Sequence, residues 1–453
     1  MRSLRRAESL RLIAAVVVAV GAVLLVESLT QGAHHSSGSG SGSAQRTLTG
    51  GAAGAAGTGG TPGSDGSSPH GSASSKAGSV TVAGGPAVER SLKHGSMIVV
   101  IDQPPPGLFA QQNSSIAQGA EVAVHELNAA GGLPRGIHVT LVRQSLDGLS
   151  ATALKVRLSS EAAAVLILPC DTDSQLSLAA AASQYGMLML APCNPDSTAG
   201  ARYATYWPVG LPASAEAAGM VEFMKEIGPG SAFIVTAPGS RYVELVTNDF
   251  RSAAQAGGVQ LAGSASIPMT TNNFSSLAHA IEATNPMPAA IYTALPPPLV
   301  NRIASGLKAL GLHQTVVGST AMDTPLTLSS GSAALESAVF ATNGFPREST
   351  SARRFAAEYS RMFGRDPVGS FPALGLETIR LLEAAVRKAG SAQPSAVQQA
   401  LAGGISLSGV GLAPRAYEPG GDHNPVGQVD ITKVSTGSFL PLFASTPKGV
   451  SSP

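Results

Sequence analysis

The sequence predicts an α/β protein with two doubly wound lobes, and the first indication is the position of its two cysteines. Cys170 ends the apolar run AAAVLILPC and Cys193 ends the run GMLMLAPC, with the alanine-rich helical stretch SQLSLAAAASQY between them. Continuous apolar runs of this length are typical of parallel strands that are buried on both faces. Both sulfurs are then expected at the carboxyl ends of neighbouring strands, where an open α/β sheet binds its ligands.

The second indication is the regular alternation of strand and helix patterns that begins at Ser96. Such alternation predicts a parallel sheet covered by helices on both faces. Strands are expected at 96–103, 137–144, 162–170 and 186–193, and helices at 114–132, 151–161 and 174–185.

A second series of the same kind follows and predicts the second lobe. The chain has 453 residues, more than one core of roughly 250–300 residues accommodates, so two lobes with a cleft between them are expected. Strands are expected at 231–237, 259–268, 289–295, 315–320 and 337–345, helices at 242–258, 274–285, 300–311, 351–364, 373–390 and 394–404, and strands with a hairpin over 413–443.

Residues 1–30 have the pattern of a signal peptide or an N-terminal membrane anchor. Four arginines precede the apolar stretch 12–26, which is short beside the about 17–25 residues of a spanning helix. The positive flank places the amino terminus in the cytoplasm and the rest of the chain outside. The protein is therefore expected outside the cytoplasm, tethered to the cell membrane, or secreted if the segment is cleaved.

Residues 31–95 are mostly Gly, Ser, Ala and Thr, which predicts a disordered linker. A flexible chain of this length spans roughly 40–50 Å, enough for a tether. The net charge of +1 gives no reason to expect a nucleic-acid partner.

The sequence contains no recognisable catalytic or cofactor motif. It lacks the G-x-S-x-G, phosphate-loop and H-E-x-x-H patterns, and its nine histidines are scattered. Asp171 and Asp173 could pair as acid and base, but no nucleophile is visible nearby. We therefore expect a protein that is not an enzyme and that needs no cofactor or metal.

The two cysteines are expected to form a disulfide. Adjacent parallel strands lie about 4.8 Å apart, which is compatible with the roughly 4.4–6.8 Å between the Cα atoms of a disulfide. Thiols outside the cell usually oxidise. The alternative is a pair of buried free thiols that pack as small apolar residues.

Several stretches in this order and spacing resemble the solute-binding proteins of branched-chain amino-acid ABC importers, which have the type I periplasmic-binding fold. The similar stretches are PPPGLFAQQNSSIAQGAEVAVHELNAAGGLPRG, GMLMLAPCNPD, TTNNFSSLAHAIEATNPMPAAIY, LKALGLHQTVVGST and FAAEYSRMFGRDPVGSFPALGLETIRLLEAAVRKAG. The resemblance covers about residues 96–442. It implies two lobes joined by three crossings that close around a small ligand, as in a Venus flytrap.

By analogy, the crossings fall near residues 207–213, 336–348 and 404–412. Lobe 1 then comprises residues 96–210 and 342–408, and lobe 2 comprises residues 211–341 and 409–445. Trp207, at the first crossing, is expected to pack at the hinge.

The expected ligand site collects the turns that follow the strands. These candidates are Phe109 after the first strand, Asp171, Thr172, Asp173 and Ser174 after the third, Ala191, Cys193 and Asn194 around the end of the fourth, and Tyr242, Ser319, Thr320 and Asp323 in the second lobe. The hydroxyls of Thr172 and Ser174 can donate to a ligand carboxylate, but an aspartate beside them can instead cap the following helix.

The ligand is expected to differ from a simple branched-chain amino acid. The family's carboxylate that holds the ligand ammonium is replaced by Thr320, and Asp323 lies three residues later. A buried ammonium without an acceptor is costly. A polar neutral solute, or one whose cationic end meets Asp171 or Asp173, fits better.

The resemblance therefore implies a monomeric solute-binding protein that delivers a small molecule to an ABC permease in the membrane. The alternative is a ligand-sensing ectodomain of the same fold that works with a membrane signalling partner.

Overall fold

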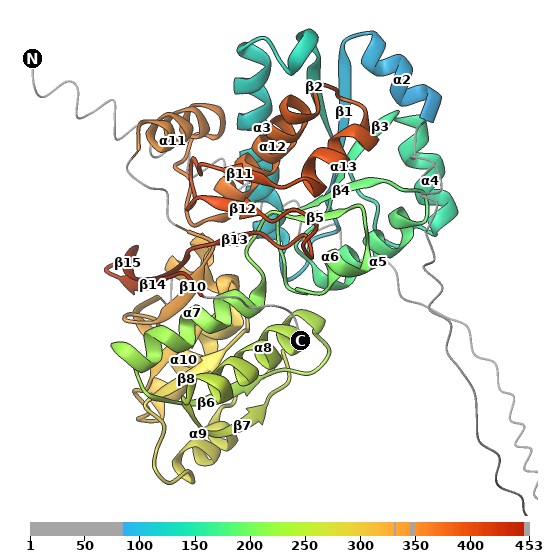
Figure 1. Cartoon of the computed structure of the whole chain (residues 1–453). Coiled ribbons are helices and arrows are strands. Elements are labelled where there is room, and N and C mark those ends of the chain that lie inside the picture. Colours follow the sequence, from blue (N-terminus) through green and yellow to red (C-terminus); the bar gives the residue numbers. More distant parts are fainter. Residues whose placement is uncertain (1–84, 330–331, 345–348, 448–453) are drawn as a thin grey trace, which may run out of the picture. The chain divides into compact units, whose positions relative to one another are not determined.

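The computed structural model describes residues 85–329, 332–344 and 349–447 (Figure 1). The expected signal or anchor at 1–30 and the linker up to residue 84 lie outside the described residues. Within the described ranges, no helix combines the length and the apolar character that crossing a membrane requires.

The folded part begins before residue 96, because helix α2 occupies Gly85–Lys93. Val88 of this helix is buried, and the Ser91 hydroxyl donates a hydrogen bond to the Ser96 carbonyl over 2.9 Å. The linker expected to continue to residue 95 therefore ends earlier, since this segment packs its apolar residue against the first lobe.

The first lobe is built on a parallel five-stranded sheet in the order β2-β1-β3-β4-β5 (Figure 1). All five residues of β3 are buried, as its unbroken apolar run predicts. The strands are β1 (Ser96–Asp102), β2 (His138–Gln144), β3 (Ala163–Ile167), β4 (Leu188–Ala191) and β5 (Tyr206–Pro208), and the helices between them are α3 (Ala110–Ala129), α4 (Ala151–Ser160), α5 (Thr172–Ser183) and α6 (Ala199–Arg202).

Three later helices return to this lobe: α11 (Thr350–Phe363), α12 (Phe371–Ala389) and α13 (Pro394–Ala402). Helices α3 and α12 approach so closely that only glycine fits at their crossing. A Cβ on Gly119 would lie 1.8 Å from the Pro372 carbonyl oxygen, and one on Gly375 would lie 1.9 Å from that of Ile116. This contact fixes the start of α12, and with it Phe371, beside the carboxyl ends of the strands of this sheet.

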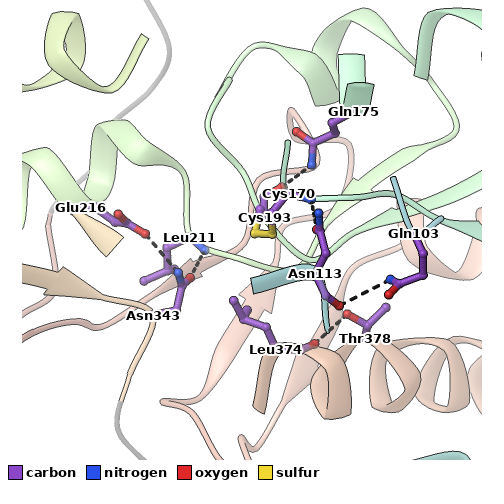
Figure 2. The surroundings of a disulfide bond; sticks show 10 residues. All are labelled: Gln103, Asn113, Cys170, Gln175, Cys193, Leu211, Glu216, Asn343, Leu374 and Thr378. Atoms are coloured by element: carbon purple, nitrogen blue, oxygen red, sulfur yellow. Dashed lines mark hydrogen bonds between the residues drawn. A yellow bond between two sulfur atoms is a disulfide. The ribbon is translucent and has the colours of Figure 1, made fainter. Parts of the chain in front are cut away.

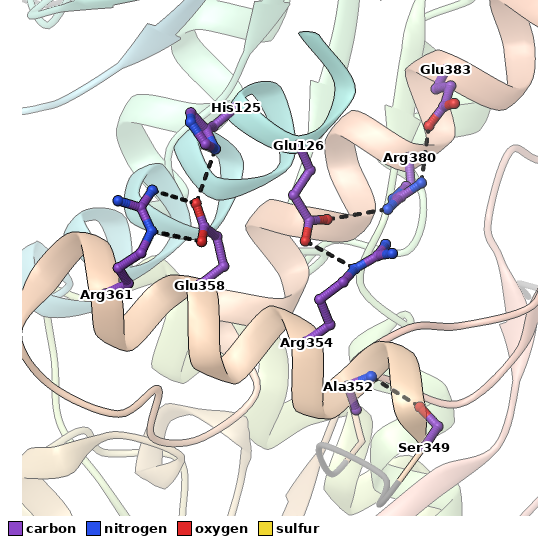
Figure 3. Close-up of polar contacts among 9 residues, drawn as sticks. All are labelled: His125, Glu126, Ser349, Ala352, Arg354, Glu358, Arg361, Arg380 and Glu383. Carbon is purple, nitrogen blue, oxygen red and sulfur yellow. Dashed lines mark hydrogen bonds and ion pairs between the residues drawn. The ribbon is translucent and has the colours of Figure 1, made fainter. Parts of the chain in front are cut away.

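Polar side chains link α3 to α11 and to α12 (Figure 3). The Glu126 carboxylate pairs with Arg354 over 3.3 Å and with Arg380 over 3.4 Å. The Glu358 carboxylate pairs with His125 over 3.0 Å. The two pairs at Glu126 are partly exposed, so each contributes about 1 kcal/mol or less to stability.

The second lobe is built on a seven-stranded sheet in the order β15-β14-β10-β9-β8-β6-β7. Strands β6 to β10 are parallel, and β14 and β15 add antiparallel to one edge. The strands are β6 (Ser231–Thr236), β7 (Gln260–Ser266), β8 (Ala290–Thr293), β9 (Thr315–Gly318), β10 (Val339–Thr342), β14 (Val429–Ser435) and β15 (Ser438–Ser445), and the helices are α7 (Ala213–Glu226), α8 (Arg241–Gly257), α9 (Ser275–Glu282) and α10 (Leu299–Ala309).

A small antiparallel sheet corrects the expected boundary of the lobes. Strands β11 (Ile405–Leu407), β12 (Arg415–Tyr417) and β13 (Val426–Gly427) pair with one another and not with the seven-stranded sheet. The Tyr417 hydroxyl donates to the Pro208 carbonyl over 2.7 Å, and His423 stacks on Trp207 at 3.8 Å. Residues 409–427, assigned to lobe 2 from the sequence, are therefore anchored to lobe 1.

The three crossings follow from this connectivity. The first runs from β5 to α7 and the second runs from β10 to α11. The third joins β13 to β14 near Gln428, later in the chain than the expected 404–412, because β12 and β13 first complete the small sheet.

Candidate functional site

Residues of both lobes line one cavity, called here the interlobe cavity, with an empty volume of about 410 Å³ that includes its open mouth. Both lobes and the crossings between them contribute to its wall. The first contributes Phe109, Cys170, Cys193, Asn194, Pro195 and Phe371, and the other lining residues are Leu211, Ala213, Glu216, Tyr242, Val246, Thr320, Ala321 and Asn343.

A disulfide forms part of the wall, which confirms the predicted pairing of Cys170 with Cys193. Their Cα atoms lie 5.2 Å apart at the ends of adjacent strands. Side-chain amides hold both cysteine backbones, since Asn113 Oδ1 accepts from Cys170 N over 2.7 Å and Gln175 Nε2 donates to the Cys193 carbonyl over 2.9 Å (Figure 2). The sequence pattern that located the strand ends thus located this wall as well.

Two aromatic rings from different lobes meet beside the cavity. Phe109, the residue before α3, and Tyr242, near the start of α8, pack edge to face with ring centroids 4.9 Å apart. The Tyr242 hydroxyl pairs with Ser319 Oγ over 3.0 Å. The contact joins the two lobes at the cavity, which both rings line.

Glu216 places a buried carboxylate in the cavity wall from the first turn of α7. Its side chain is held by neutral donors: Thr320 Oγ1 donates to Oε2, and Asn343 Nδ2 donates to Oε1 over 3.1 Å (Figure 2). Burial raises the pKa of Glu216 to about 7, and the charge of Asp323 raises it further, while Thr320 and the more distant Arg415 lower it. The carboxyl group therefore changes charge near neutral pH.

A network of hydrogen bonds behind Glu216 joins the first two crossings to strand β12. Arg415 of β12 donates to the carbonyls of Val209 on the first crossing and Asn343 on the second. Asn343 Oδ1 in turn accepts from Leu211 N over 2.8 Å. These bonds orient the Asn343 amide so that its NH₂ group faces Glu216.

Five of the predicted ligand residues line the interlobe cavity, namely Phe109, Cys193, Asn194, Tyr242 and Thr320. Ser319 does not line the cavity, but its hydroxyl forms a hydrogen bond with that of Tyr242, which does. Ala191 is buried at the end of β4 and does not line the cavity.

The turn after the third strand is the main difference from the expected site. Asp171, Thr172, Asp173 and Ser174 are absent from the cavity lining. Asp171 caps α5 by accepting from Ser174 N over 3.0 Å, and Ser174 Oγ donates to Asp147 over 3.0 Å. The capping alternative considered from the sequence is therefore the one observed, and a cationic ligand group at Asp171 or Asp173 is not supported.

Asp323, considered from the sequence as an acceptor for a ligand ammonium, has a different role in the structure. Its carboxylate accepts from Ser370 N over 2.9 Å and from the Thr342 hydroxyl, so it links the second lobe to the start of α12. Burial raises the pKa of Asp323. It does not line the interlobe cavity.

Sequence reasoning missed Glu216, Asn343 and Phe371. Glu216 lies in the segment ASAEAAGMVEF, where it reads as one acid on an alanine-rich helix. Its position one turn after the first crossing is the only signal that could have identified it.

In the described ranges, no three His, Cys, Asp or Glu side chains gather as metal ligands would.

The comparisons with known proteins agree with this architecture. A family model described as periplasmic binding protein matches residues 103–438. A leucine-binding protein of Thermotoga maritima is similar in structure with a TM-score of 0.67 and 19% identity, over 78% of this chain and 99% of that one. A search of curated protein sequences gives no significant match.

Two further solved structures are similar at low identity. A solute-binding protein of an R. palustris ABC transporter, in complex with benzoate, has a TM-score of 0.65 and 18% identity over 78% of this chain and 96% of that one. A substrate-binding protein of a Desulfitobacterium hafniense ABC transporter, in complex with Leu, has a TM-score of 0.64 and 19% identity over 77% of this chain and all of that one.

The fold and the interlobe cavity define a two-lobed protein of the ligand-binding type. The chain belongs to the periplasmic binding protein family, whose members bind solutes for ABC transporters. Membership of this family implies a location outside the cytoplasm.

Proposed function

We propose that this protein is an extracytoplasmic solute-binding protein that closes its lobes on one small molecule and delivers it to an ABC permease. The observation that carries the proposal is the interlobe cavity, to which both lobes contribute walls. A ligand that contacts both walls stabilises the closed state by the difference between its affinities for the closed and open states.

The hinge network supports this mechanism. Arg415 and Asn343 hold the first two crossings together, and the lobes would rotate about this bonded pair of crossings. Hinges that absorb such motions are a few residues at the ends of secondary-structure elements, which is where these residues lie. The proposal includes no catalytic role for Glu216.

The proposal includes a tether. Residues 1–30 would hold the protein at the outer face of the membrane and residues 31–84 would give it reach. Such a tether raises the effective concentration of the loaded protein at the permease.

The experiment is a ligand screen of the full chain by thermal shift and native mass spectrometry. One bound molecule per chain, with a raised unfolding midpoint, is the expected result. Uptake of that compound by cells with and without the gene then tests delivery. Unchanged uptake on deletion would contradict delivery to a permease and favour the sensing ectodomain.

A further inference from the structure

The interlobe cavity presents two hydrogen-bond acceptors, and each of its side-chain donor groups already forms a hydrogen bond within the chain. Four of its lining residues carry a side-chain donor. Thr320 and Asn343 both donate to Glu216, Tyr242 pairs with Ser319, and Asn194 Nδ2 donates to the Asn424 side chain. Among the described residues of the lining, none is Lys, Arg or His.

Asn194 leaves an acceptor without a partner. Its Nδ2 donates to Asn424 Oδ1 over 2.9 Å and to the Gly210 carbonyl over 3.4 Å. Asn424 must present its oxygen there, because its own Nδ2 donates to the Ser197 carbonyl and to Asp422. The network therefore fixes the orientation of the Asn194 amide, and Asn194 Oδ1 remains buried with no hydrogen-bond partner in the described structure.

Glu216 is the second acceptor, and the surrounding amides fix it in that role. Since Asn343 Oδ1 accepts from Leu211 N, only the NH₂ group of Asn343 can face Glu216. The glutamate is 7% exposed. A buried carboxylate held only by neutral donors favours either a proton or a ligand cation.

Three of the positive helix ends near the cavity are matched by acidic or polar groups of the chain, whereas α3, which begins after Phe109, has no side-chain cap and no acid in its first turn. Asp171 caps α5, Glu216 occupies the first turn of α7, and Ser240 caps α8 by accepting from Val243 N. A ligand carboxylate would therefore compete with these groups at the three helix ends, and the negative charge of Glu216 would repel it.

The remaining walls suit an apolar body with a positive end. The rings of Phe109, Tyr242 and Phe371 line the cavity together with Val246 and Leu211. Aromatic faces attract cations and also bury apolar groups.

We infer that the ligand is an ammonium compound with a compact apolar body and without a carboxylate, bound with its ammonium between Glu216 and Asn194 Oδ1. This inference rests on the proposed function and names the ligand class of the same site. It departs from the sequence-based expectation in placing the cationic end at Glu216 instead of at Asp171 or Asp173.

The test is a thermal-shift and calorimetric screen of the full chain with compounds in matched sets. Each set has an amine, the corresponding amino acid, the carboxylate and the alcohol on one carbon skeleton. Two such sets are isoamylamine, leucine, isocaproate and isoamyl alcohol, and phenethylamine, phenylalanine, hydrocinnamate and phenethyl alcohol. A general metabolite library is screened alongside them, with its members sorted into the same classes.

The expected binders are amines, and Glu216→Gln should weaken their binding about 30-fold or more, because it removes the buried charge partner. Asp171→Asn is the matched control and should leave the affinity unchanged, since Asp171 lies outside the lining. The folding of both variants is checked by their unfolding midpoints without ligand.

A pH series gives a second readout that a purely structural role for Glu216 would not produce. Amine affinity should rise from about pH 5.5 to pH 8 as Glu216 loses its proton, with proton release seen by calorimetry in two buffers. The other groups whose charge acts on Glu216 are Arg415 and Asp323, and Tyr242 lies beside it. Asp171→Asn should keep this pH dependence.

Three results overturn the inference: tighter binding of an amino acid, carboxylate or alcohol than of the amine, amine binding that Glu216→Gln leaves intact, or binders in the library that lack an amine. In each of these cases the solute-binding function stands. If no compound of any class binds, the proposed function fails and this inference fails with it.

Discussion

Asn343 Nδ2 donates a hydrogen bond to Glu216 Oε1 over 3.1 Å, from the second crossing to a helix that follows the first. The bond connects the hinge with the wall of the interlobe cavity. A ligand that changes the charge of Glu216 therefore acts directly on a residue that also holds two crossings together.

The first prediction concerns the stability of the ligand-free protein. The pKa of Glu216 is raised from 4.5 to about 7 in the folded state, so its contribution to stability is present below pH 4.5 and is lost as the pH rises through 7. Between pH 5 and 8 the wild type should lose on the order of 2 kcal/mol more than Glu216→Gln. Urea unfolding of both proteins at the two pH values measures this difference.

The comparison with Glu216→Gln separates this effect from two other carboxyl groups. Burial raises the pKa of Asp102 and of Asp249 to about 6, and both are present in either protein. If the free energy of unfolding depends on pH in the same way in wild type and variant, the pKa of Glu216 is not shifted by folding, which would contradict this prediction.

The second prediction concerns Arg415, which is 3% exposed. Arg415→Met removes the donor to the Val209 and Asn343 carbonyls and leaves the buried Glu377 without the nearby positive charge. The expected loss is about 3–5 kcal/mol in the free energy of unfolding. Denaturant titration provides the measurement.

Arg354→Met is the matched control for Arg415. Arg354 pairs with Glu126 on the surface, where its side chain is 66% exposed (Figure 3). Its replacement should cost about 1 kcal/mol or less. Equal losses for the two variants would mean that Arg415 does not hold the crossings.

The third prediction concerns the disulfide. Cys170 and Cys193 are separated by 23 positions. In the chain-entropy account, removing a disulfide that closes a loop of this length lowers the free energy of unfolding by about 3 kcal/mol. The Cys170→Ser/Cys193→Ser double variant should unfold at correspondingly lower urea concentration and bind ligand more weakly, because the bridge lines the cavity. If the variant has the same stability and the same ligand affinity as the wild type, the disulfide contributes to neither, and the prediction is wrong.

The fourth prediction concerns the contact between Phe109 and Tyr242. Phe109→Ala removes the ring that touches the other lobe and should accelerate ligand dissociation about two- to tenfold, the value of one edge-to-face pair. Tyr242→Phe keeps both rings and loses only the hydroxyl bond to Ser319, so its effect should be smaller. Stopped-flow fluorescence of Trp207, the only tryptophan, can follow the rates. The reverse order of effects would contradict this account of the closed state.

The sequence predicted the secondary structure well because the relevant patterns are local. Strand β3 is a continuous apolar run, and α8 and α12 end at Gly258 and Gly390 in the left-handed conformation that glycine favours. The disulfide followed from the same strand ends. By contrast, the contact of Gly119 with Pro372 joins residues far apart in the chain, and neither glycine of that crossing signals its partner.

The site was predicted only in part, for a related reason. Turns after strands located Phe109, Asn194 and Tyr242, because the edge of a parallel sheet is a property of the topology. Glu216 reaches the cavity from a helix after a crossing, and its role depends on Asn343. That pairing is set by the hinge geometry, which strand and helix patterns do not encode.

Hydrogen–deuterium exchange of the full chain, with and without a compound found to bind, tests the central claim most directly. One ligand per chain should protect backbone segments of both lobes together, around Phe109 and Cys193–Pro195 in the first and around Ala213–Glu216, Tyr242 and Thr320–Ala321 in the second. Protection confined to one lobe, or located away from these segments, would contradict closure of the two lobes on a ligand in the interlobe cavity.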